Sequence, residues 1–228
     1  MLSLAQRHQR RQQAAKAANT NAPQMAGATA YELQLMQLKQ DQLRLKQIQS
    51  SQGKAKLKTK LLPAYTPYID GVLQSGTGAQ DDIVTTIMLW QMDAANYARA
   101  LQIGAYVLKF NLKMPDRFAR TSACVIAEEL SDAALAKLKQ NEPFERALLE
   151  QTQTLTNGHD MPDEVRAKVH LALGKQWLFE ATTDEQNPDN TQLEHAQSEL
   201  KAAIDLHNRC GGKKDLERVE RLLKRTAD

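Results

Sequence analysis

The sequence predicts an all-α protein. Apolar residues recur at intervals of three and four along most of the chain, and no segment shows the convincing period-two alternation of a strand. Leu, Ala, Gln, Lys and Glu, which favour helices, are abundant among the 228 residues. We expect a basic N-terminal arm and a long coiled-coil-like helix, followed by a helical body of packed helix hairpins. The body faintly resembles tetratricopeptide repeats, although no strict repeat period fits.

Residues 1–28 are expected to form a flexible basic arm. A helix is conceivable over 7–18, but this run has no repeating apolar face, and the Asn- and Pro-containing run 19–23 would end it. We therefore expect the arm to lack packing of its own.

A long helix is expected over 29–60. Thr29 can cap it, with Glu32 in the capping-box position, and its regular part reaches about Ser51 before Gly53 interrupts it. A narrow apolar stripe with partly heptad spacing follows one side of an otherwise polar rod, which is typical of a coiled-coil seam. The residues of this stripe, expected to mediate oligomerisation, are Tyr31, Leu35, Leu38, Leu45 and Ile48.

The helical body is expected over 61–228. Its first half is predicted to contain a short helix over 65–73, a helix that carries the apolar run 83–90, and a helix that opens at Asp93 and ends before Asn111. Turns rich in Gly, Asn and Pro separate these segments.

The second half of the body is predicted to hold five more helices. Thr121 can cap the first, Pro143 suits the first turn of the second, and Asp160 can cap the third, whose first turn is acidic. The last two form a hairpin at a Gly-Gly turn. The expected ranges are 121–140, 143–155, 160–177, 191–209 and 213–225.

Formal charge is divided unevenly along the chain. The first 62 residues contain eleven Lys and Arg against two Asp and Glu, whereas the remainder contains 19 against 25. A basic head on an acidic body indicates a polyanionic partner, with nucleic acid favoured over a membrane surface. The alternative to a polyanionic partner is that the basic segment is simply a solvent-exposed helix. The candidate nucleic-acid-binding cations are Arg7, Arg10, Arg11, Lys16, Lys54, Lys56, Lys58 and Lys60.

Several other classes of protein are disfavoured. The longest apolar stretch, 83–90, is far shorter than the roughly 20 residues of a membrane span, and the N-terminus lacks the apolar core of a secretory signal. Cys124 and Cys210 form no CxxC pair, so a reducing cytoplasm is the simplest compartment. The five histidines show no zinc spacing, and no phosphate-binding loop is present, so we expect neither a metal nor a cofactor.

Asp81 and Asp82 form the one acidic pair that merits a catalytic interpretation. Convergent carboxylates hold Mg²⁺ in metal-dependent nucleases. Adjacent aspartates at the start of a helix, however, ordinarily act as caps and dipole partners. We therefore expect no catalytic residue, and Asp81 with Asp82 and Mg²⁺ stays as the weaker alternative.

Eight segments, in order along nearly the whole chain, resemble the small terminase subunit of P-two-like temperate bacteriophages. They are Ala5–His8, Leu61–Leu73, Gly78–Ile83, Met88–Trp90, Ala100–Ile103, Arg120–Thr121, Met161–Lys168 and Lys213–Arg218.

The resemblance implies a role in viral genome packaging. Such a subunit binds viral double-stranded DNA at the packaging site, forms a homo-oligomer that is expected to be a ring, and recruits and regulates a large subunit that carries the ATPase and nuclease. The host cytoplasm is the implied location. Small subunits of this family are often labelled endonuclease, whereas terminases generally keep the cutting nuclease in the large subunit. The resemblance therefore favours a non-catalytic DNA-binding subunit, with a Mg²⁺-dependent endonuclease as the alternative.

Overall fold

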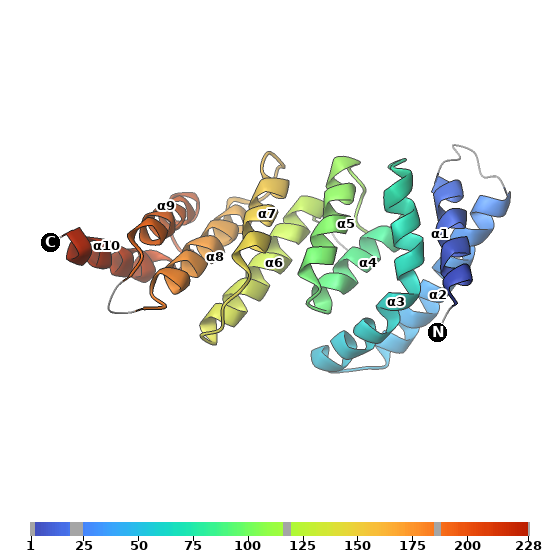
Figure 1. The fold of residues 1–228 in the computed structure, drawn as a ribbon, viewed down its shortest axis with the longest axis horizontal. Coiled ribbons are helices and arrows are strands. Elements are labelled where there is room, and N and C mark those ends of the chain that lie inside the picture. The colour runs from blue at the N-terminus through green and yellow to red at the C-terminus, as the bar shows by residue number, and fades with distance from the viewer. Residues whose placement is uncertain (1–2, 19–24, 116–119, 185–187, 228) are drawn as a thin grey trace. The chain divides into compact units, whose positions relative to one another are not determined.

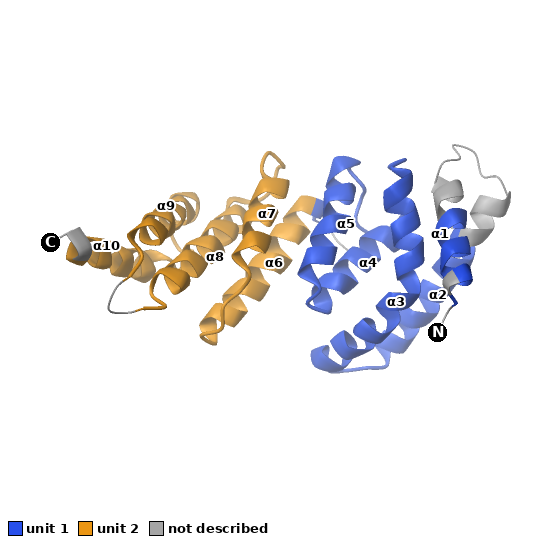
Figure 2. Ribbon diagram, viewed as in Figure 1, with its two compact units in different colours: residues 1–122 blue, residues 123–228 orange. Residues whose placement is uncertain are grey.

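The computed structural model describes residues 3–18, 25–115, 120–184 and 188–227, and within them every regular element is an α-helix (Figure 1). This confirms the all-α prediction. The chain divides into two compact units, residues 1–122 and 123–228 (Figure 2). The described helices are α1 (Leu4–Ala18), α2 (Met25–Lys46), α3 (Ser51–Ser75), α4 (Asp82–Asp93), α5 (Tyr97–Lys109), α6 (Ser122–Lys139), α7 (Arg146–Thr156), α8 (Asp163–Ala181), α9 (Asn190–Leu206) and α10 (Lys213–Ala227).

The first unit is built around α3. Helix α1 packs against α3 and α2, α2 also contacts α4, and α4 packs between α3 and α5. The T-shaped contact between the Tyr65 and Trp90 rings, with centroids 5.8 Å apart, joins α3 to α4. The largest fully buried side chains of this core are Tyr65, Ile69, Ile83, Ile87, Met88, Leu101 and Ile103.

The second unit is a succession of packed antiparallel neighbours. Helix α8 packs against α7 and α9, and α9 packs against α10, which confirms the predicted hairpin at the end of the chain. Gly174 in α8 lets α9 approach closely, because a Cβ at this position would lie 2.7 Å from Leu200 Cγ. The core at this end consists of Leu171, Leu178, Ala181, Leu193, Ala196, Leu200, Ala203 and Val219.

The N-terminal segments differ from the prediction. Instead of a flexible arm, residues 4–18 form α1, which packs on α3; residues 19–24 lie outside the described part. The predicted long helix is two helices, separated at 47–50 rather than at Gly53. Ser50 caps the second helix, its hydroxyl accepting a hydrogen bond from the Gly53 backbone at 3.1 Å.

Helix α3 crosses the predicted boundary between residues 60 and 61. It continues through Pro63 and Pro67, although we expected a separate, shorter helix over 65–73 that begins after Pro63. Proline removes a backbone donor and clashes with the preceding turn, so it bends a helix that packing holds together. The two halves of α3 accordingly run in different directions in Figure 1.

Three predicted helix starts are also corrected. Asp93 ends α4, and α5 begins after Asn96. Pro143 lies before the Glu145 cap of α7, and α8 follows Pro162 rather than an Asp160 cap. The acidic first turn predicted for α8 is present.

Candidate nucleic-acid interface

The basic residues of α1 lie on the outside of the first unit. Arg7 and Arg10 are exposed. Arg11 donates to Asp70 in α3 at 3.2 Å, and Asp70 also binds Arg99 of α5. Lys16 belongs to α1, but its side chain lies outside the described residues. Arg7 and Arg10 are therefore available to an anionic ligand, whereas Arg11 also fastens α1 to α3.

The four predicted lysines of the second group occupy the first turns of α3. Lys56 and Lys60 are exposed and Lys54 is half-buried. Lys58 forms an ion pair with Asp93 at the end of α4. Because a helix turns by about 100° per residue, alternate positions spread over the surface rather than lining one edge. Lys58 therefore points back toward the unit, while its neighbours face solvent.

One group of cations lies on α1, which Arg11 fastens to the C-terminal half of α3, and the other lies on the N-terminal half of α3 itself. Arg11 contacts Asp70 near its C-terminal end, and Lys54–Lys60 occupy its N-terminal end. Asp70 follows Lys58 by twelve residues, which corresponds to about 18 Å of helix. The eight candidate cations thus form two separate groups on one unit, rather than one continuous strip.

The predicted apolar seam faces the interior of the first unit. Leu38 and Leu45 are only 2% and 7% exposed, and Tyr31, Leu35 and Ile48 are half-buried. Burial and the charges of Asp81 and Asp82 raise the pKa of Tyr31. The seam's predicted role in oligomerisation is untested, but Leu38 and Leu45 are already covered within the chain.

A buried aspartate strengthens this packing of α2. Asp41 accepts a hydrogen bond from the Tyr65 hydroxyl at 2.8 Å and another from Arg44 at 2.9 Å. Burial, followed by the hydrogen bond to Asp41, raises the pKa of Tyr65 far above its ordinary value, so the hydroxyl keeps its proton and donates. Sequence periodicity located the apolar stripe but gave no sign that it packs inward.

The exposed apolar residues of α2 lie on another face. Leu33, Met36 and Leu43 are 63%, 59% and 59% exposed. Their spacing, with Gln40 completing the series, is that of alternating a and d positions in a heptad. The exposed outer face of α2 therefore has the heptad spacing of a coiled-coil seam. The prediction had assigned this role to the face that packs inside the unit.

Asp81 serves as the N-cap of α4. Its Oδ1 accepts from the backbone of Ile83 at 2.8 Å and of Val84 at 3.2 Å, and its Oδ2 accepts from the Tyr68 hydroxyl at 2.6 Å. Burial raises the pKa of Asp81 despite these hydrogen bonds. Both of its oxygens are engaged in the fold, whereas the neighbouring Asp82 is exposed.

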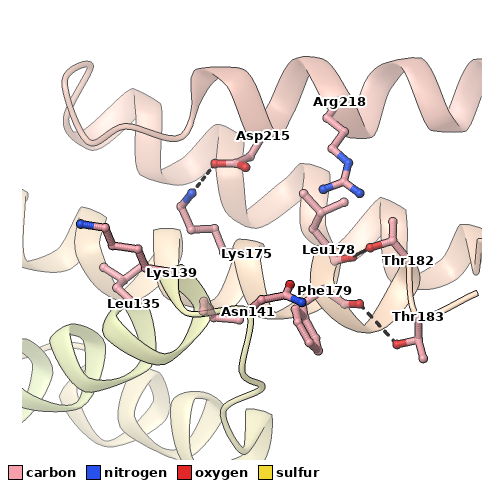
Figure 3. A pocket seen from close by; sticks show the side chains of 11 residues that line it. Leu135, Lys139, Asn141, Lys175, Leu178, Phe179, Thr182, Thr183, Asp215 and Arg218 are labelled. Carbon is pink, nitrogen blue, oxygen red and sulfur yellow. Dashed lines mark hydrogen bonds and ion pairs between the residues drawn. The ribbon is translucent and has the colours of Figure 1, made fainter. Parts of the chain in front are cut away.

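The second unit contains a polar pocket that the sequence did not reveal. It has a volume of about 760 Å³ and lies between the end of α6, the second half of α8, and α10 (Figure 3). Lys139, Lys175 and Arg218 line it together with Asp215, which binds Lys175. The three cations that line this pocket come from α6, α8 and α10, which are distant from one another in sequence.

Two other kinds of site are absent from the described residues. No group of three or more His, Cys, Asp or Glu side chains is placed to hold a metal ion. None of the described helices combines the length and apolar character required to cross a membrane.

The described part of the chain is thus all-helical, with cations exposed on α1 and α3. The family model "Phage small terminase subunit" matches residues 35–164, more than half of the chain, and the chain belongs to this family. Over 224 residues it is 42% identical to the "Terminase, endonuclease subunit" of Escherichia phage P2, an alignment that covers 98% of this chain and 87% of that protein. No solved structure matches the chain.

Proposed function

We propose that the chain binds viral double-stranded DNA at the packaging site, associates with further copies of itself, and recruits and regulates the large ATPase/nuclease subunit in the host cytoplasm. The observation that supports DNA binding most directly is the exposure of Arg7, Arg10, Lys56 and Lys60 on two helices of a small terminase subunit. Ammonium and guanidinium groups of this kind neutralise DNA phosphates and release counterions.

In this proposal the two groups of cations position the duplex rather than read its sequence. Phosphate contacts fix orientation and supply affinity, whereas base contacts or DNA deformation supply specificity. Because Arg11 and Lys58 already bind Asp70 and Asp93, we assign them first to holding α1 and α3 in place. The remaining exposed cations then reach the phosphates from a fixed scaffold.

Removing the lysines of α3 is expected to weaken DNA binding. The triple variant Lys54→Gln/Lys56→Gln/Lys60→Gln should lower the slope of log affinity against log salt by about 2–3, since each lost phosphate contact contributes about 0.9. Fluorescence anisotropy with labelled duplex DNA at several salt concentrations measures this slope.

The matched control is Lys39→Gln/Lys113→Gln/Lys201→Gln. It removes the same charge from exposed lysines outside both groups. An equal loss of affinity in both triple variants would indicate a general charge effect and would reject the assigned contacts.

We further propose that self-association uses the outer face of α2. The occupant is a second copy, because the face is complementary to itself when two α2 helices run antiparallel. Glu32 lies in the N-terminal half of α2 and Lys46 at its C-terminal end, so antiparallel packing would bring each chain's Glu32 toward the partner's Lys46. Such a two-fold contact closes on itself, and a ring would need a second, heterologous contact.

Leu33→Ser/Met36→Ser/Leu43→Ser is expected to reduce the native mass of the protein in solution. These side chains are largely exposed, so their replacement should leave the melting temperature of the single chain nearly unchanged. Analytical ultracentrifugation of the wild type and the variant measures the effect. An unchanged mass distribution would place self-association elsewhere.

The name of the P2 relative supports a second candidate, a Mg²⁺-dependent endonuclease that itself cuts the packaging site. Its candidate residues in this chain are Asp81 and Asp82. The hydrogen bonds of Asp81 to Tyr68, Ile83 and Val84 favour the capping role instead. We therefore place cutting in the large subunit.

A further inference from the structure

We propose that the outer face of α10 in the second unit is a separate phosphate-binding surface for duplex DNA. Lys214, Arg218, Arg221 and Arg225 follow one another at intervals of four, three and four residues, and all four are exposed. This spacing places them on one side of the helix. From the first to the last they extend over eleven residues, or about 16 Å.

Packing fixes which side of α10 faces outward. Val219 is fully buried in the core of the second unit, and Leu216, Leu222 and Leu223 pack against the same core. The cations opposite them cannot turn inward without exposing these apolar side chains. The basic face is therefore a rigid surface of the folded unit rather than a tail that adapts to its surroundings.

The charge of α10 contrasts with the rest of its unit. Residues 123–212 contain eight Lys and Arg against 16 Asp and Glu, whereas α10 (Lys213–Ala227) contains six against three. Within the described residues, no carboxylate forms an ion pair with Lys214, Arg218 or Arg221 within 4.0 Å. For these three residues, an anionic ligand would supply the counter-charge.

The helix dipole explains only some of the basic residues of α10. Basic residues in the last turn, here Lys224 and Arg225, favour a helix because they face the negative end of its dipole. Lys213 and Lys214 occupy the first turn, where the dipole opposes positive charge. Asp215 in the same turn suits the dipole, but it does not account for the two lysines, whose charge an anionic partner would neutralise.

The polar pocket extends the surface beyond α10. Arg218 belongs both to the exposed face and to the pocket lining, and Lys139 and Asn141 reach the pocket from the end of α6 (Figure 3). Guanidinium, ammonium and amide groups are the donors that bind phosphate oxygens. A duplex lying along α10 would thus place backbone phosphates against the stripe and at the mouth of the pocket.

The variant Lys214→Gln/Arg218→Gln/Arg221→Gln tests this surface in the full-length chain. With a random-sequence duplex as the probe, we expect affinity at low salt to fall by about 10- to 100-fold and the salt slope to fall by about 2–3. The charge-conserving variant Lys214→Arg/Arg218→Lys/Arg221→Lys should restore both values. Equal melting temperatures for all three proteins show that the fold is intact.

The outcome separates this proposal from DNA binding by the first unit. If the α10 variant binds as the wild type does while the α3 lysine variant loses affinity, the α10 surface is rejected and the first-unit contacts stand. An acidic protein partner on α10 would give the same unchanged DNA affinity and would likewise overturn the proposal. If both variants lose DNA affinity, and if a protein that combines their substitutions loses the sum of the two reductions in salt slope, the result supports two separate DNA-binding surfaces.

Discussion

Asp81→Ala is expected to lower the free energy of unfolding by about 2–4 kcal/mol. Loss of an N-cap costs about 1 kcal/mol, and a buried donor left without a partner costs about 1–3 kcal/mol more. In this variant the backbone of Ile83 and the Tyr68 hydroxyl both lose their acceptor. Urea denaturation followed by circular dichroism measures the change. A loss below about 0.5 kcal/mol would show that the cap does not hold α4 to α3.

Asp81→Asn is the matched control. An asparagine oxygen can still cap the helix, and its amide can donate to the Tyr68 oxygen, so the cost should stay below about 1 kcal/mol. Burial raises the pKa of Asp81, so the folded wild type binds this proton more tightly than the unfolded chain. Wild-type stability therefore falls as pH rises from the ordinary carboxyl range through the raised pKa, and Asp81→Asn should lack this contribution.

The same variant addresses the nuclease alternative. If Asp81 bound a catalytic Mg²⁺, Asp81→Asn would abolish Mg²⁺-dependent cutting of packaging-site DNA by the purified chain. We expect the extent of Mg²⁺-dependent cutting to be the same for the wild type and for Asp81→Asn, because the Asp81 side chain is engaged in capping α4.

Gly174→Val is expected to destabilise the second unit by about 3 kcal/mol or more. A Cβ at this position would lie 2.7 Å from Leu200 Cγ and 3.1 Å from the Leu200 backbone nitrogen. The Leu200 side chain could yield only by moving into a packed core. The backbone of α9 could yield only by moving away from α8. Overpacking of this kind typically costs 1–3 kcal/mol, and the β-branched side chain and backbone contact raise this value. Urea denaturation measures the loss.

A double-mutant cycle identifies the cause. Leu200→Ala alone should cost about 2–5 kcal/mol, because Leu200 is fully buried. Combined with Gly174→Val, it removes the obstructing side chain, so the double variant should be more stable than the sum of the two losses. Strict additivity would contradict the close contact between α8 and α9.

The helical class and most helix positions could be predicted because they depend on local signals. The spacing of Ile83, Ile87 and Trp90 and a cap at Asp81 or Asp82 predicted α4, and the Gly-Gly turn predicted the α9–α10 hairpin. Pro63 misled the prediction of α3, because tertiary packing retains a helix there that local propensity would end.

The candidate site was less predictable, since it depends on which face of each helix is covered. The heptad-like stripe of α2 could be found from the sequence, but its burial depends on contacts such as Asp41 with Tyr65, which are 24 residues apart. Counting charges located the basic first helices, whereas ion pairs such as Lys58 with Asp93 could not be inferred. The basic face of α10 was present as a spacing of Lys and Arg, but the acidic total for residues 63–228 concealed it.

The most direct test of the central claim is the salt dependence of duplex binding by the wild-type chain. If exposed cations on folded helices contact the phosphates, log affinity should fall with log salt at a slope of about −4 or steeper. Packaging-site DNA should bind more tightly than a scrambled duplex under the same conditions. Binding that is independent of salt, or no binding of duplex DNA even at low salt, would contradict the account.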